Sequence, residues 1–212
     1  MLEQTLPAEK RNWARTGLWL VAATMAYNVI EAVIALWSGA AAESIALVGF
    51  GLDSVIECTA AGVLLWRLSL ETRGVDAHTL EIAERRVHRV VGVTFLALAA
   101  YVTAQSVFTL WQQEAPRESW IGIALAAASL VIMPLVSWGK LRAAREIGSA
   151  ALLAEAKETL ACSYLSFALL LGLCANAVAG WWWADPAAAM AMTPWLVKEG
   201  REGLRGESCE DD

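Results

Sequence analysis

The sequence predicts an all-α, polytopic membrane protein with six transmembrane helices. Hydrophobic residues make up 58% of the 212 residues and charged residues only 18%, and the mean hydropathy is +0.48. Apolar residues gather in six long segments, and the basic residues lie almost entirely on one side of them. This composition is too apolar for an ordinary soluble domain and is typical of a multi-span helical membrane protein.

The six segments define the domain organisation. They are residues 17–38, 44–66, 90–111, 120–138, 149–174 and 185–204. About 20 helical residues cross the hydrocarbon core, and the first five segments reach that length. We therefore expect a transmembrane domain over residues 17–204, between a cytoplasmic N-terminal segment (1–16) and an acidic cytoplasmic tail (205–212).

The sixth segment is the shortest in apolar content. It follows three tryptophans at 181–183, a residue type that favours the membrane interface. Asp185 and Pro186 suit the opening of a helix, with the aspartate as N-cap and the proline at the first helical position.

The basic residues predict the orientation in the membrane. Of the 16 lysines and arginines, all but Arg117 and Lys157 fall on one side of a six-span arrangement. Lys140, Arg142 and Arg145, for example, fall in the expected loop between the fourth and fifth spans. The positive-inside rule then places both termini and the longer loops in the cytoplasm, and we expect the plasma membrane.

Two other stretches could bind metal. The expected loop 68–88 carries His78 and His88 among acids and arginines, and we expect it to be a solvated entry to the third helix. The tail holds Cys209 among acids and is expected to be an unstructured end rather than a weak site for a soft cation.

The second segment carries two carboxylates at membrane depth. Asp53 and Glu57 are four residues apart, so a helix places both on one face. Each ionisable side chain costs roughly 2.5–3.5 kcal/mol at the bilayer centre on insertion scales, so the pair needs a compensating partner. A bound cation is the simplest partner, and a structural hydrogen-bond network between helices is the alternative.

The fifth segment repeats this spacing with Glu158 and Cys162. Counted along antiparallel helices, both pairs reach similar depths, about 14 to 20 Å from one end. Together they would supply the four ligands of a tetrahedral site for zinc, or for a softer ion such as cadmium. Alternatively, Glu158 pairs with Lys157 or faces the cytoplasmic mouth, Glu155 takes its role, and Cys162 is a small buried hydrophobe.

Further acids lie near the outer ends of the first and sixth segments. Glu31 and Asp185 could line an exit vestibule or, with Glu155, a proton path. The alternatives are an interhelical polar contact for Glu31 and a helix cap for Asp185.

The chain resembles the cation diffusion facilitator, or cation efflux, family of proton-coupled exporters of divalent metals. The resembling residues are Asn28 to Glu31, Glu43 to Leu47, Asp53 to Glu57, Ala154 to Cys162, Asp185 with Pro186, and Glu199 with Gly200. The resemblance implies a metal site at Asp53, Glu57, Glu158 and Cys162 and a homodimer. It departs from the family at Glu158 and Cys162, where histidine and aspartate are usual. The usual C-terminal cytoplasmic domain is also missing, so we expect a membrane-only variant.

The resulting hypothesis is proton-coupled efflux of a divalent transition metal of the zinc or cadmium class. We expect no tightly bound cofactor, no enzyme activity and no nucleic-acid partner. The expected partners are the bilayer, divalent metal ions, protons and a second copy of the chain. The alternatives are a non-transporting accessory or sensor protein that binds metal, and a proton-coupled exporter of organic cations.

Overall fold

The chain folds into long helices that match the six predicted segments one for one. The computed structural model describes residues 8–71, 77–113 and 116–205, with no strand among them. The helices are α1 (Ala8–Ala42), α2 (Ile45–Glu71), α3 (Ala77–Gln112), α4 (Trp120–Ile147), α5 (Ala150–Ala179) and α6 (Ala184–Arg205). The predicted all-α fold class is confirmed.

Five of these helices, α1 to α5, are long and apolar enough to cross a membrane. Helix α6 does not meet that criterion, because its last two turns are rich in charge between Lys198 and Arg205. It nevertheless packs against α2, α3 and α5 inside the bundle. The helices together support an integral, multi-pass membrane protein.

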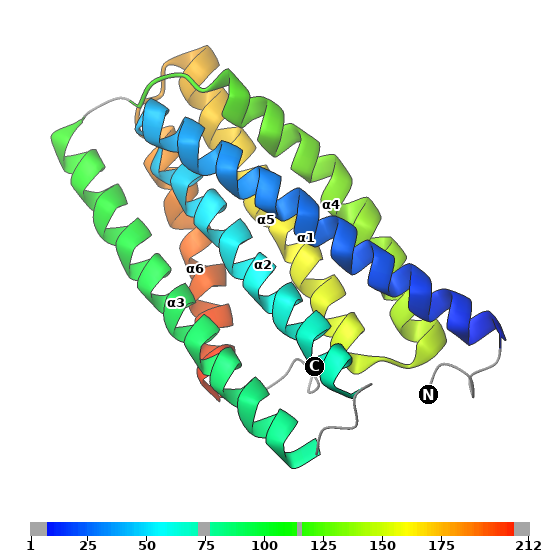
Figure 1. The fold of residues 1–212 in the computed structure, drawn as a ribbon. Helices are drawn as coiled ribbons and strands as arrows, with labels where there is room; N and C mark the ends of the chain where they lie inside the picture. The colour runs from blue at the N-terminus through cyan, green and yellow to red at the C-terminus, as the bar shows by residue number, and fades with distance from the viewer. Residues whose placement is uncertain (1–7, 72–76, 114–115, 206–212) are drawn as a thin grey trace.

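The helices form a four-helix group with a two-helix pair beside it. Contacts join α1 to α2 and α4, and α5 to α2 and α4. Helices α3 and α6 lie side by side at one edge and pack on α2 and α5 respectively (Figure 1). The first turn of α1 and the last turn of α6 lie at the same end of the bundle (Figure 1).

Small residues let α6 approach its neighbours closely. A Cβ added at Gly92 on α3 would lie 2.8 Å from the carbonyl oxygen of Gly200 on α6. A Cβ at Gly172 on α5 would lie 2.5 Å from the Cβ of Ala188 on α6. Small residues at such crossings allow backbones to touch, as is typical of helices packed in membranes. The first half of α6 is therefore held against α5, and its charged last turns are held against α3.

Asp185 does not cap its own helix as predicted, because α6 already begins at Ala184. Its carboxylate instead accepts hydrogen bonds from the hydroxyl of Ser44 and from the backbone N–H of Ile45 (2.9 Å). The first N–H groups of a helix lack intrahelical partners and carry partial positive charge. The buried start of α2 offers these donors to Asp185, which is 1% exposed.

Several observed helices are longer than the predicted ones. The segment 1–16 is helical from Ala8, and α4 continues to Ile147 instead of ending at 138. Lys140 is therefore a fully buried helical residue, not a loop residue, and Arg142 lies on α4 with its guanidinium 5.2 Å from the ring centroid of Trp13. Charged side chains that contact neighbouring helices can thus extend a span beyond its apolar stretch.

The expected loop 68–88 is helical at both ends, since α2 reaches Glu71 and α3 begins at Ala77. The side chains of His78 and His88 and the tail with Cys209 lie outside the described residues. Their predicted roles stay predictions.

Candidate metal site

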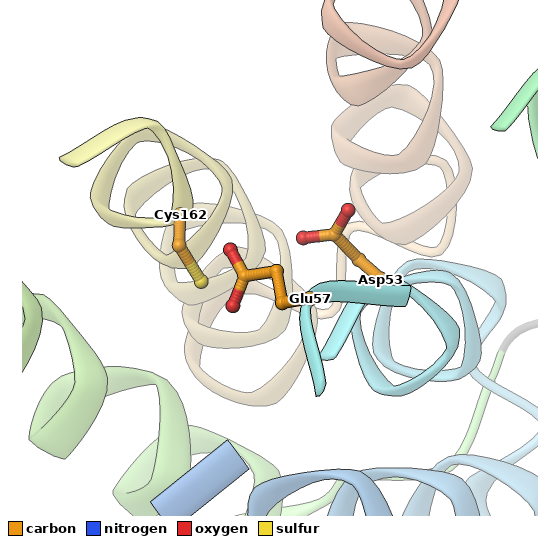
Figure 2. A group of neighbouring side chains, drawn as sticks. All are labelled: Asp53, Glu57 and Cys162. Carbon is orange, nitrogen blue, oxygen red and sulfur yellow. The ribbon is translucent and has the colours of Figure 1, made fainter. Parts of the chain in front are cut away.

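The two carboxylates of α2 and one thiol of α5 lie together in the interior. Asp53, Glu57 and Cys162 are 3%, 8% and 1% exposed, and one ligand atom of each lies within 4.8 Å of the others. Figure 2 shows the carboxylate of Glu57 between the Cys162 sulfur and the Asp53 carboxylate. The helical period places Asp53 and Glu57 one turn apart on the same face of α2.

These three groups have the chemistry of a transition-metal site. Carboxylate oxygens and a thiolate sulfur bind zinc at roughly 2.0–2.3 Å, so two ligands of one tetrahedral ion lie roughly 3–4 Å apart. Small side-chain rotations would bring atoms within 4.8 Å of each other to that spacing. The thiolate favours softer ions within the same class.

Glu158, the fourth predicted ligand, lies next to this group but is not part of it. It lines a cavity of about 10 Å³ together with Glu57, Asn28, Glu155 and Thr159. This volume suits about one water molecule. The structure thus brings three predicted ligands together and places Glu158 beside Glu57 at the cavity.

Asn28 holds Glu57 in place from the neighbouring helix. Its buried side-chain amide donates a hydrogen bond of 2.7 Å to one oxygen of Glu57. Partners of metal ligands commonly fix their orientation. Asn28 was not predicted to support a metal ligand, and the available signal was its place as a polar residue at mid-span.

Glu31 makes the interhelical polar contact that was one of its two predicted roles. The carboxylate is 0% exposed and accepts hydrogen bonds from the hydroxyls of Ser54 on α2 (2.9 Å) and Ser129 on α4. The hydroxyl of Tyr27 lies 2.8 Å from that of Ser129. These contacts join α1, α2 and α4 around one acid.

Glu155 forms a buried ion pair. Lys140 on α4 donates hydrogen bonds to Glu155 (2.7 Å) and to the hydroxyl of Thr159 (2.9 Å). The two charged side chains are 0% and 11% exposed. Lys140 was predicted to lie in a loop, and its role as the partner of Glu155 was therefore not predicted. The signal in the sequence that could have indicated this role is that the helical stretch continues past Trp138.

Among the residues that the structure describes, the polar interior therefore holds more acidic than basic side chains. Asp53, Glu57, Glu158 and Glu155 gather around the metal-site cluster and its cavity, and Lys140 pairs with one of them. A divalent cation would balance the remaining acids, since isolated charge is costly at membrane depth.

Comparison with known proteins agrees with this picture. Residues 21–205 match the model of the cation efflux transmembrane domain. Transmembrane protein 163 of Xenopus laevis is 23% identical over 165 residues, which are 78% of this chain and 57% of that protein. An uncharacterized transporter of Synechocystis sp. is 26% identical over 152 residues, which are 70% of this chain and 49% of that protein.

The chain thus spans about half the length of the curated relatives it matches. Because the match extends over nearly the whole described chain, the protein belongs to the family that carries the cation efflux transmembrane domain.

Proposed function

We propose that the protein exports divalent transition metals of the zinc or cadmium class in exchange for protons. The observation that carries the proposal is the buried cluster of Asp53, Glu57 and Cys162, whose ligand atoms lie within 4.8 Å of one another. Membership in the cation efflux family supports the proposal that this cluster binds the transported ion.

The coupling to protons follows from the ligand types. Carboxylic acids and thiols must lose protons before they coordinate a metal. Facing the cytoplasm, Asp53, Glu57 and Cys162 would bind the ion and release protons. In the outward-facing conformation, protons would bind to the ligands again and the metal would be released. Glu158, across the small cavity from Glu57, would join the ion during entry or transfer.

Orientation and assembly belong to the same proposal. The basic residues favour cytoplasmic termini by the positive-inside rule, which would make a plasma-membrane protein an exporter from the cytoplasm. Family resemblance supports a homodimer.

Two other functions remain as alternatives to be tested. A non-transporting accessory or sensor protein would use the same cluster for tight binding without turnover. An exporter of organic cations would need a large, aromatic-lined site, whereas the cavity beside Glu57 measures about 10 Å³ in this conformation.

The first test is metal flux into proteoliposomes under an imposed pH gradient, with zinc, cadmium, manganese and iron(II) offered separately. We expect zinc and cadmium flux that follows the gradient and disappears in Asp53→Asn. Glu43→Gln, an exposed acid in the turn before α2, is the matched control and should transport normally.

Each other outcome has a defined meaning. Flux in Asp53→Asn at the wild-type rate would remove Asp53 from the site. Tight binding of cadmium without flux would favour the accessory or sensor function. Flux that ignores the pH gradient would remove the proton coupling.

A further inference from the structure

A buried lysine lies directly beside the proposed path of the metal. Lys140 is 0% exposed and lies between α4 and α5, near the end where these two helices are joined. A buried lysine in a membrane protein needs a partner and commonly marks a functional site. Its ammonium contacts Glu155 at 2.7 Å and Thr159 at 2.9 Å. These partners are one turn apart on α5, so the ammonium binds two successive turns of that helix.

The partners of Lys140 also line the cavity that borders the metal site. Glu155 and Thr159 share this cavity of about 10 Å³ with Glu57 and Glu158. Glu155 gives one oxygen to Lys140, and its other oxygen is buried without a hydrogen-bond partner among the described residues. The cavity is therefore bordered by three carboxyl groups, one of which already has a cation of the protein's own.

From this arrangement we infer that Lys140 limits the number of bound ions, because it keeps the cavity from retaining a second divalent ion. This inference rests on the proposed function. The ammonium of Lys140 neutralises Glu155 where a metal would otherwise do so. Glu57, Glu155 and Glu158 line this cavity without forming a ligand group as tight as the metal-site cluster. Without Lys140, the Glu155 carboxylate would be free to turn toward the other two, and the three acids would hold a second ion there. With it, an ion passes the cavity and binds only at Asp53, Glu57 and Cys162.

The contact also fixes how α5 presents its two faces. Glu155 and Thr159 are held against α4 by Lys140, and Cys162 lies against Asp53 and Glu57 of α2. A purely structural role for Lys140 would use the same contacts. The experiment must therefore measure the number of bound ions, since loss of packing would not raise that number.

The test is equilibrium binding of cadmium alone to the full-length protein in lipid nanodiscs, which yields both stoichiometry and affinity. We expect one ion per chain in the wild type and two in Lys140→Met, because the freed Glu155 completes the second site. Lys140→Met combined with Glu155→Gln should return to one ion. Lys198→Met, which removes an exposed lysine paired with Glu202, is the control and should bind one ion.

A second variant keeps the inference testable if Lys140→Met does not fold. Glu155→Gln alone leaves the ammonium unneutralised beside the cavity, and we expect cadmium affinity to fall about tenfold through charge repulsion. Removing Lys140 as well should recover that affinity. A structural role predicts no such recovery, because the double variant lacks every contact made by the pair.

The outcomes separate this inference from the proposed function. If the wild type binds no cadmium, the proposed function fails. If the wild type binds one ion, Lys140→Met also binds one, and Glu155→Gln binds with unchanged affinity, the function stands and the inference about Lys140 is overturned.

Discussion

Glu31 and the pair Asp53 and Glu57 are buried acids of the same bundle with different surroundings. Glu31 accepts hydrogen bonds from the hydroxyls of Ser54 and Ser129, and the hydroxyl of Tyr27 contacts that of Ser129, so its carboxyl group has partners within the protein. Asp53 and Glu57 instead lie close to each other and to the thiol of Cys162, and Glu57 accepts one hydrogen bond from Asn28. A hydrogen-bonded acid stabilises the contact between helices, whereas acids gathered together require a proton or a metal ion.

The partners of a buried acid distinguish a structural acid from a metal-binding acid in a membrane domain. Both kinds are polar residues in apolar helices, so hydropathy does not separate them. The distinguishing feature is the source of the partner atoms. Neutral hydroxyls donated by neighbouring helices indicate a structural contact, and clustered acids indicate a site that needs protons or a cation.

The largest expected effect contrasts one acid from each group. Glu57→Gln removes a charged ligand and should weaken cadmium binding by about 100-fold or more. Glu31→Gln should leave binding within about threefold, because an amide can still hydrogen-bond the serine hydroxyls. Cadmium titration of both purified variants measures the difference, and equal losses in the two variants would remove the distinction drawn between them.

The next effect tests the partner of Glu57. Asn28→Ala removes the donor at 2.7 Å and should weaken cadmium binding by about 10- to 100-fold, as is typical for partners of metal ligands. Asn176→Ala is the matched control, since that asparagine donates to the carbonyl oxygen of Pro116. Unchanged binding in Asn28→Ala would mean that Glu57 needs no support from α1.

A smaller effect concerns ion selectivity. Cys162→Asp replaces a soft ligand with a hard one and should lower the ratio of cadmium to zinc transport by about tenfold while transport itself persists. Cys174→Asp changes another α5 cysteine, which lies outside the metal cluster. Competition flux with both ions measures the ratio, and an unaltered ratio would exclude the sulfur as a ligand.

The smallest effect concerns the structural acid. Ser54→Ala removes one hydroxyl donor to Glu31 and should lower the free energy of unfolding by about 1 to 3 kcal/mol, because the carboxylate loses a buried partner. Cadmium affinity should remain unchanged. Thermal unfolding in detergent, compared with Thr59→Ala on the exposed face of α2, tests this assignment. A loss of affinity would place Ser54 in the metal site.

Much of the fold was predictable from local patterns. The length of each apolar segment determines that the chain forms long helices, and each of the six segments corresponds to one observed helix, starting at most one residue before it. The four-residue spacing determines that Asp53 and Glu57 share a face of α2. These features depend only on residues close together in the chain, so no knowledge of packing was required.

Partner choice could be decided only by the tertiary structure. Which α5 residue meets Glu57 depends on how α5 is rotated against α2, and the answer is Cys162 within the cluster and Glu158 at the cavity. Asp185 contacts the start of α2, 140 residues earlier in the chain. Lys140, which was predicted to lie in a loop, is a buried helical residue that binds Glu155. Buried polar groups must find partners wherever the packing places them, and that requirement acts across helices rather than along the sequence.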